Sequence, residues 1–246
     1  MPTTFQCCTD EPGRVHSPVP PLTQYASPDL IDAIAHHGHD PADDPAWAST
    51  GAPTQQEYGQ WAPHLCGMVC MQMALLHRDQ APPTLWSLRE GAVRAGAYEV
   101  TGDKIKGLIY RPFVDYAARV HRMPAEAHPT LSMVELMALC GAGRMVMASV
   151  SKDIRTPNRT PSQRGGHLVL VLGISDERVH FNNPSGHTAQ ARKAVLPLDT
   201  FEQYFGNRGI SLDTRNLLPS PLPAGIAAGK PATPARGTRP GHGRRL

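Results

Sequence analysis

The hydrophobic pattern of the chain changes near residue 143, and this change constrains the fold more than any other feature. Before it, apolar side chains fill helical turns, as in residues 66–76, which are apolar almost all round. After it come short apolar runs such as residues 145–150 and 167–172. The first pattern indicates a buried helix and the second a strand covered on both faces. We therefore expect an α+β fold, with an N-terminal helical half packed against a C-terminal antiparallel sheet.

The element boundaries follow from start and stop signals. Ser132 and Glu135 have the spacing of a capping box, and Gly206 is expected to end a late helix. The expected helices are residues 30–34, 66–76, 84–96, 112–121, 132–141 and 197–205, and the expected strands are 145–150, 167–172, 178–182 and 209–212.

Length and composition are those of one globular domain with tails. The chain has 246 residues and 40% hydrophobic side chains, and much of its proline lies near the two ends. We expect a disordered lead-in over residues 1–18, a domain over 19–215 and a disordered Pro/Gly/Arg-rich tail over 216–246. The basic tail resembles a solvated terminus, and no nucleic-acid-binding motif accompanies it, so we expect no nucleic-acid partner.

The sequence favours a reducing compartment. The first ten residues lack a basic start and an apolar core, and no stretch reaches the length of a membrane-spanning helix. Five cysteines, including Cys7 and Cys8, are an odd number, which argues against a full disulfide framework. We expect a cytoplasmic protein without membrane insertion; its oligomeric state is left open.

Cys66 is the candidate nucleophile because it begins the buried helix. Unpaired N–H groups and the helix dipole favour a thiolate at this position, and a nearby histidine can accept the proton. Cys70 lies one turn further in, where those groups are already paired, so we interpret it as a core residue, and Cys140 likewise.

His167 is the candidate base, since it opens a strand after two glycines. The next strand ends at Asn183, and two antiparallel strands joined by a tight turn bring their outer ends together. The Asn183 side chain could therefore orient the imidazole. Asn182 is the competing choice, but its opposite strand parity turns it away if Asn183 faces the cleft.

An oxyanion formed on a substrate carbonyl needs hydrogen-bond donors. The backbone N–H of Cys66 at the helix start is one candidate, and the side chain of Gln60, six residues earlier, is the second. The alternative for Gln60 is an ordinary exposed polar residue.

These residues resemble the papain-like cysteine peptidase superfamily. Gln60…Cys66-Gly67, Gly166-His167 and Asn183-Pro184 are similar to the catalytic pattern of bacterial C39-type peptidase domains. Val19-Pro20…Gln24 and Leu198…Phe201…Gly209-Ile210 extend the similarity to residues 19–213. The resemblance implies a papain-like fold with its active-site cleft between the two halves.

The chain departs from the family pattern at several points. Met68-Val69-Cys70 follows Cys66-Gly67, in place of the Ser-Cys-Trp type of papain. Asn183 stands where the C39 group often has Asp, and residues 26–58 form a long insert. The C39 peptidases best known for cleaving leader peptides are fused to membrane transporters. No such transporter is evident in this sequence, so we do not expect a leader peptide as its substrate.

Two polar segments have weaker signals. His36, His37, His39 and Asp40 include zinc-binding side chains, but they lack the thiolates or second distant pair that structural sites use, so we expect neither a metal nor a cofactor. The loop over residues 153–165 is rich in arginine and could meet an acidic substrate, although a solvated loop is the simpler interpretation.

We therefore expect a thiol peptidase or amidase that cleaves a peptide or amide bond through an acyl-enzyme on Cys66, with His167, Asn183 and Gln60 in support. The alternative is an acyl- or peptidyl-transferase that uses the same residues with an amine as acceptor. A non-catalytic binding module is disfavoured because all four residues are present. The expected partner is a peptide or acyl-amide substrate.

Overall fold

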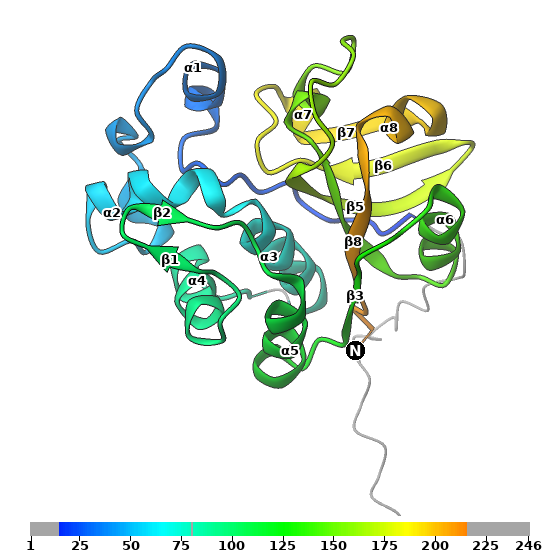
Figure 1. The fold of residues 1–246 in the computed structure, drawn as a ribbon, viewed down its shortest axis with the longest axis horizontal. Helices are drawn as coiled ribbons and strands as arrows, with labels where there is room; N and C mark the ends of the chain where they lie inside the picture. The colour runs from blue at the N-terminus through cyan, green and yellow to red at the C-terminus, as the bar shows by residue number, and fades with distance from the viewer. Residues whose placement is uncertain (1–14, 80, 216–246) are drawn as a thin grey trace, which may run out of the picture. The chain divides into compact units, whose positions relative to one another are not determined.

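The computed structural model describes residues 15–79 and 81–215. Helices occupy mainly its first half and strands its second, which confirms the expected α+β class (Figure 1). The helices are α1 (Ile31–His36), α2 (Gln55–Trp61), α3 (Cys66–Asp79), α4 (Leu85–Arg94), α5 (Tyr110–His121), α6 (Met133–Gly141), α7 (Ala189–Arg192) and α8 (Leu198–Tyr204). Short 3-10 turns are η1 (Pro28–Leu30), η2 (Pro41–Asp43), η3 (Trp47–Thr50), η4 (Ala62–His64) and η5 (Lys152–Arg155).

The strands form a small hairpin and one large antiparallel sheet. The hairpin pairs β1 (Val100–Thr101) with β2 (Lys104–Ile105). The sheet contains β3 (Ala125–His128), β4 (Met145–Ser151), β5 (Gly166–Ser175), β6 (Arg178–Asn182), β7 (Lys193–Pro197) and β8 (Phe205–Leu212). Its order is β3-β8-β4-β5-β6-β7, so the last strand of the described chain lies inside the sheet, between β3 and β4.

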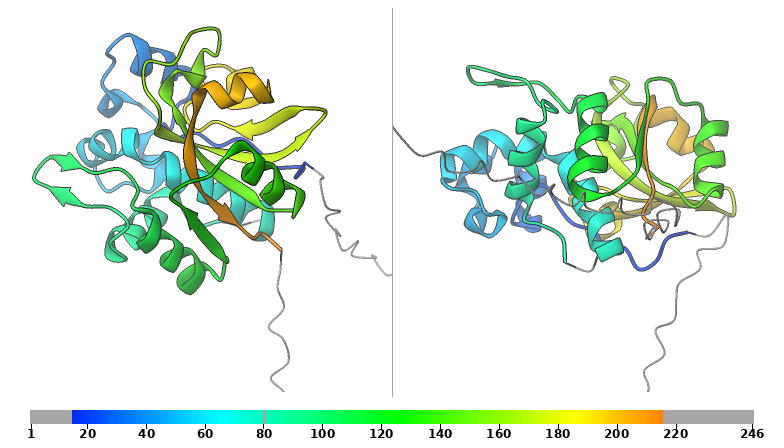
Figure 2. Two further views of the ribbon diagram at one scale, coloured as in Figure 1. Left: turned by 45° about the vertical axis from the view of Figure 1, so that its right-hand side comes forward. Right: turned by 90° about the horizontal axis from the view of Figure 1, so that it is seen from below.

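Both faces of the sheet are covered, as the unbroken apolar strands predict. On β4, Met145 and Met147 join the core cluster that contains α3, α4 and α5. The alternate residues Val146 and Ala148 join a second cluster with α6 and α8. Seen from below, the helices stand on either side of the sheet (Figure 2). This alternation is the period-two pattern of a strand between two apolar layers.

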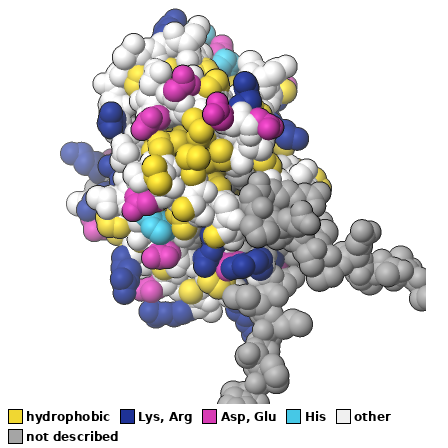
Figure 3. All heavy atoms as spheres, turned by 90° about the vertical axis from the view of Figure 1, so that its right-hand side faces the viewer, with side chains coloured by type: hydrophobic (Ala, Val, Ile, Leu, Met, Phe, Trp, Pro, Cys, Tyr) yellow, Lys and Arg dark blue, Asp and Glu magenta, His cyan; other side chains and the backbone are white. Residues whose placement is uncertain are grey.

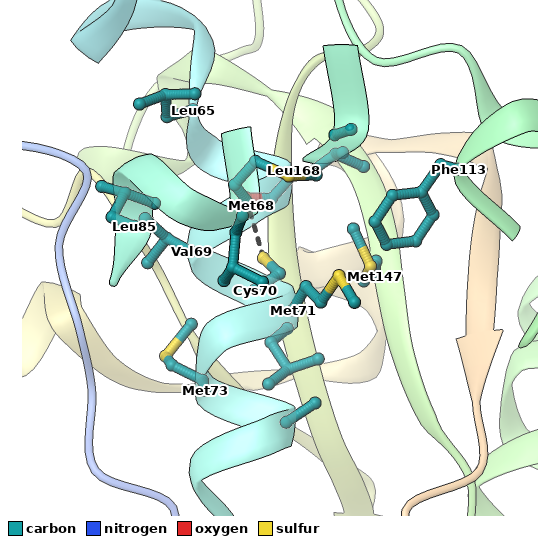
Figure 4. Close-up of a cluster of buried hydrophobic side chains, with 14 of the residues drawn as sticks. Leu65, Met68, Val69, Cys70, Met71, Met73, Leu85, Phe113, Met147 and Leu168 are labelled. Carbon is teal, nitrogen blue, oxygen red and sulfur yellow. Dashed lines mark hydrogen bonds between the residues drawn. The ribbon is translucent and has the colours of Figure 1, made fainter. Parts of the chain in front are cut away.

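Helix α3 is the centre of the first cluster. Eight of its residues are buried. Met71 points towards Met147 of β4 (Figure 4), whereas the Met73 sulfur on the other side of the helix accepts from the Leu22 N–H (3.3 Å). The Cys70 thiol lies 3.7 Å from the carbonyl oxygen of Leu168. Burying the helix on all sides fixes its first residue, Cys66, beside the start of β5.

An extended segment precedes the insert and ties the two halves together. The His16 N–H donates to the Leu172 carbonyl (3.0 Å), and the Gln24 N–H donates to the Pro184 carbonyl (2.9 Å). Within residues 15–18, which belong to the expected disordered lead-in, His16 is therefore bonded to β5. The rest of the expected lead-in, with Cys7 and Cys8, and the expected tail lie outside the described residues.

The insert over residues 26–58 folds around a buried carboxylate. Asp44 is fully buried and accepts hydrogen bonds from the Ser27 hydroxyl (2.6 Å), the Ser27 N–H (2.9 Å), the Ala46 N–H (3.0 Å) and the Tyr58 hydroxyl (2.8 Å). The Ala26 N–H in turn donates to the Tyr58 hydroxyl (2.9 Å). We call Asp44, Ser27, Ala46 and Tyr58 the Asp44 network. It closes the insert onto itself at both ends.

Most expected elements are confirmed, including the capping box of α6. Helices α2 and α7 and strands β1, β2, β3 and β7 were not predicted, because each is a short segment with few large apolar residues. The expected helix end at Gly206 is wrong: α8 passes directly into β8 at Phe205, which is buried in the second core cluster.

The outer surface of α6 carries exposed apolar side chains. Val134 and Met137 are exposed on this helix, which lies at the right of Figure 1. The face seen in Figure 3 shows hydrophobic side chains gathered among acidic and basic ones.

Within residues 15–79 and 81–215, no helix combines the length and the hydrophobicity needed to cross a bilayer.

Candidate functional site

Cys66 and His167 line one cavity of about 330 Å³ between the helical half and the sheet. Cys66 is the first residue of α3 and is partly exposed, whereas His167 is the second residue of β5 and is 4% exposed. The cavity is also lined by Pro63, His64, Gly107, Leu108, Tyr110, Ser149, Lys152, Gly166, Leu168 and Arg208. The sequence prediction that a cleft brings Cys66 and His167 together agrees with this arrangement.

The first turn of α3 fits tightly under the opposite wall. A Cβ on Gly67 would lie 2.7 Å from Leu108 Cδ2 and 3.2 Å from Leu168 Cδ1. The absence of a side chain at Gly67 therefore allows the Cys66 end of the helix to approach β5. N–H groups in the first turn of a helix have no acceptor within the helix, and Cys66, whose N–H is one of these groups, lines the cavity.

Burial raises the pKa of the Cys66 thiol above its ordinary value. Hydrogen bonds from the backbone N–H groups of Leu168 and Gly67 oppose this rise, followed by the positive charges of Lys152 and Arg155. The thiol is thus neutral near pH 7 in the free protein, but four groups are already placed to stabilise a thiolate that forms during a reaction.

His167 and Asn183 meet at the ends of their strands, as the strand geometry predicts. His167 Nε2 lies 2.8 Å from Asn183 Oδ1, and both residues are buried. Because an amide oxygen only accepts hydrogen bonds, Nε2 must carry the proton in this contact. The lone pair of the neutral ring is therefore on Nδ1, the atom left to act as a base.

Ser185 and Arg155 complete the surroundings of the imidazole. The Ser185 hydroxyl lies 3.1 Å from His167 Nε2, and it accepts a hydrogen bond from Arg155 Nε at 2.8 Å. The Ser185 N–H donates to Asn183 Oδ1 at 3.0 Å. We call His167, Asn183, Ser185 and Arg155 the His167 network. The sequence had not singled out Ser185, and it placed Arg155 only in an arginine-rich loop.

The pKa of His167 is lowered to about 3. Burial is the main cause, and the charges of Arg155 and Lys152 lower it further, while the hydrogen bond with Asn183 acts in the opposite direction. The imidazole is therefore neutral over the whole physiological range. It can accept a proton, but holding that proton requires a negative charge beside it.

The loop that carries Asn183 is held on both sides. The Asn183 N–H donates to the Arg192 carbonyl (2.8 Å), and the Gly186 N–H donates to the Asn183 carbonyl (3.1 Å). A Cβ on Gly186 would lie 2.4 Å from the backbone of Ala191 and Arg192, so only glycine fits there. Asn182 points elsewhere: its Nδ2 donates to the Val19 carbonyl at 3.0 Å.

Gln60 does not line the cavity that contains Cys66. It is an exposed residue of α2 and borders a different depression, together with Asp40 and Gln55. The expectation that Gln60 faces the cleft is therefore wrong. The reason is that residues 55–61 form a helix, which directs the Gln60 side chain into solvent and not towards the start of α3.

Gln24 is the glutamine that lies near the start of α3. It is buried, and its Nε2 donates to the Ala62 carbonyl (2.9 Å). Its backbone N–H donates to the carbonyl of Pro184, the residue after Asn183. Its Oε1 is buried without a hydrogen-bond partner. The next residue, Tyr25, is close enough to Cys66 that the two influence each other electrostatically. The sequence pattern includes Gln24 only as part of the leading segment and predicts no role for it.

The rim of the cavity is basic. Lys152 and Arg208 are exposed lining residues, and no acidic residue is among the described residues that line the cavity. Burial raises the pKa of the Tyr110 hydroxyl, and its interactions with Ser149 and Arg208 oppose this rise. The prediction that the arginine-rich loop meets an acidic substrate stays a prediction; of its arginines, Arg155 contacts the His167 network.

The remaining cysteines of the described chain are buried. Burial raises the pKa of Cys70 well above its ordinary value and that of Cys140 to about 12. Both lie in the hydrophobic clusters, Cys70 with α3 and Cys140 with α6. Neither lines the cavity, in agreement with their interpretation as core residues.

No family model and no curated protein matches the sequence. Solved structures similar to this chain include a putative C39-like peptidase from Bacillus anthracis, with 16% identity and a TM-score of 0.44 over 62% of this chain and 90% of that one. A double-glycine-motif protease from an AMS/PCAT transporter, in complex with the leader peptide, has 14% identity and a TM-score of 0.41 over 60% and 82%. The peptidase domain of Streptococcus ComA, a bi-functional ABC transporter, has 12% identity and a TM-score of 0.42 over 61% and 90%. At these values the likeness assigns no role to any residue.

Proposed function

We propose that the protein is a cysteine hydrolase that cleaves a peptide or amide bond, with Cys66 as nucleophile and His167 as base. The observation that carries this proposal is the 2.8 Å contact between His167 Nε2 and Asn183 Oδ1 beside a cavity shared with Cys66. A nucleophile, a base and a group that orients the base are the minimum for covalent acyl transfer.

In the first half of the reaction, Nδ1 of His167 accepts the Cys66 proton as the sulfur attacks the carbonyl carbon. The C–S bond forms while the carbonyl π electrons move to oxygen. His167 then returns the proton to the departing amine as the C–N bond breaks, which leaves a thioester on Cys66. In the second half, His167 takes a proton from water as the hydroxide adds to the thioester carbon. The C–S bond then breaks to release the acid, and His167 returns the proton to the Cys66 sulfur.

The resting protonation states fit this order of events. A buried imidazole with a lowered pKa and a thiol with a raised pKa are both neutral, so proton transfer is driven by the attack itself. As the thiolate character grows, the N–H groups of Leu168 and Gly67 stabilise it. The developing oxyanion would receive the Cys66 N–H and the Gln24 amide N–H that is not bonded to the Ala62 carbonyl. Gln24, like Gln60, does not line the cavity itself, but it is buried near the start of α3, whereas Gln60 is exposed on α2.

The experiment is acylation of the purified full chain by 4-nitrophenyl acetate, followed by intact-mass measurement. The parent protein should show a burst of nitrophenol and a single acetyl adduct, and Cys66→Ala should show neither. Cys140→Ala is the matched control, because it removes a thiol that does not line the cavity, and it should acylate like the parent. Equal acylation of the Cys66→Ala variant would contradict the nucleophile assignment.

The same assay separates hydrolysis from transfer. When glycine amide is added to the acylated protein, a hydrolase releases mainly acetate, and a transferase releases mainly the acetylated amine. Release of acetate at every amine concentration supports the proposed hydrolysis, whereas complete capture by the amine would contradict it.

A further inference from the structure

The α1 helix and the loop that holds Asn183 bring together two histidines and a carboxylate. Asp32 and His36 are one turn apart on α1 and so share a face of the helix. His187 comes from the far end of the sequence, four residues after Asn183. One ligand atom from each of the three residues lies within 4.8 Å of the other two.

We propose that Asp32, His36 and His187 form a binding site for a divalent transition-metal ion, of which Zn²⁺ is the best fit. Two imidazole nitrogens and one carboxylate oxygen are a donor set that zinc accepts, with water in the fourth position. Ligand atoms around a tetrahedral zinc ion are about 3.3 Å apart, given bond lengths of about 2.0–2.2 Å. Small side-chain rotations would close the present spacing to that value.

The side chains already have features of such a site. The rings of His36 and His187 are perpendicular, with centroids 5.8 Å apart. Nδ1 of His187 is buried and has no hydrogen-bond partner within the described structure. A buried imidazole nitrogen without a partner costs free energy, and coordination of a metal ion by this nitrogen would offset that cost.

Groups next to the three proposed ligands could orient them and give the ion access. His37 Nε2 lies 3.3 Å from Asp32 Oδ2, so this imidazole can orient the carboxylate without binding the ion. His187 also borders a surface hollow of about 640 Å³ that includes Arg155, and Asp32 and His36 are exposed, which leaves a path for the ion to enter. This set differs from the sequence cluster His36–Asp40, for which no metal was expected.

The position of the site gives the ion a mechanical role. Asp32 and His36 belong to the insert, whereas His187 follows Asn183 and Ser185 of the His167 network. Because Gly186 and Asn183 are clamped against Arg192, a restraint on His187 is passed to the asparagine that orients the imidazole. A bound ion would thus fasten the insert to the Asn183 loop.

The experiment measures Zn²⁺ binding to the full chain in a Cys66→Ala background, which removes the thiol that could compete for zinc. Titration against a chromophoric chelator should give one ion per chain, and His187→Ala, His36→Ala and Asp32→Ala should each weaken binding at least about 10-fold. His39→Ala is the matched control, since it removes an imidazole from the same segment outside the site, and it should bind zinc like the background protein.

Two further readouts do not depend on enzyme activity. Co²⁺ should give the visible absorption of a four-coordinate site, and Zn²⁺ should raise the thermal unfolding midpoint of the background protein but not of His187→Ala. The absence of binding in a folded background protein would overturn the proposal. Retention of full affinity in His187→Ala would also overturn it, because the ion would then bind α1 alone.

Discussion

The Asp44 network and the His167 network are both buried clusters of polar groups, but they differ in how completely their hydrogen bonds are made. The two oxygens of Asp44 accept four donors, and those hydrogen bonds more than offset burial, so that its pKa lies below the ordinary value. In the other network, Asn183 Nδ2 is buried without a partner, and the pKa of His167 falls to about 3. The first arrangement stabilises the fold, whereas the second costs stability and, under the proposed function, keeps His167 neutral so that it can accept a proton.

Replacing Asn183 should separate the two kinds of network most clearly. Asn183→Ala removes the acceptor that holds the His167 ring, so we expect a loss of kcat/KM of about 10²–10⁴-fold. The free energy of unfolding, measured with urea, should fall by about 1–3 kcal/mol, because the buried His167 Nε2–H and the Ser185 N–H lose their acceptor, and the variant should remain folded. A loss of stability that accounts for the whole loss of activity would place Asn183 with Asp44 as a structural residue.

The two glutamines provide the next comparison. Gln24→Ala should lower kcat by about 10²–10³-fold, the usual effect of removing one oxyanion donor, with a smaller change in KM. Gln60→Ala is its matched control and should leave both constants unchanged, since Gln60 is exposed on α2. A loss of kcat in Gln60→Ala with no loss in Gln24→Ala would instead support Gln60 as the oxyanion donor, as the sequence predicted.

The Asp44 network should show the opposite behaviour. Asp44→Asn places an amide NH₂ against the donors of Ser27 and Tyr58, and we expect a loss of about 2–4 kcal/mol in the free energy of unfolding. Asp40→Asn is the control: this exposed carboxylate caps η2 through the Ala42 N–H (2.9 Å), and its replacement should cost less than about 1 kcal/mol. Equal losses in urea unfolding would show that burial of Asp44 does not matter.

The smallest effect is a dependence of stability on pH. Below pH 6.5, His167 binds a proton in the unfolded chain but not in the folded protein, whose pKa is about 3, so folding becomes less favourable as the pH falls through this range. Between pH 6.5 and 5.5 the expected loss is about 1 kcal/mol. His167→Gln should lack this part of the slope, and an identical slope in the variant would show that His167 is protonated when folded.

The sequence predicted the parts of the site that depend on regular structure. Cys66 could be found because it begins an apolar helix, and His167 and Asn183 because two strands and a tight turn fix their relation. Gln60 was misplaced because a family spacing cannot reveal that its segment forms the outward-facing helix α2. Ser185, Arg155 and His187 could not be found, since their positions depend on loop conformations that have no period in the sequence.

The place of β8 inside the sheet has a consequence for protein synthesis. Cys66 leaves the ribosome long before β4 and β5, and β4 lacks its neighbour on one side until β8 has been made. A nascent chain that stops short of Leu212 would expose two open strand edges, on β3 and β4, which are sites for aggregation. Under the proposed function, completion of the sheet would therefore couple catalytic competence to the near-complete synthesis of the domain, because a partly made chain carries the Cys66 thiol without the finished sheet.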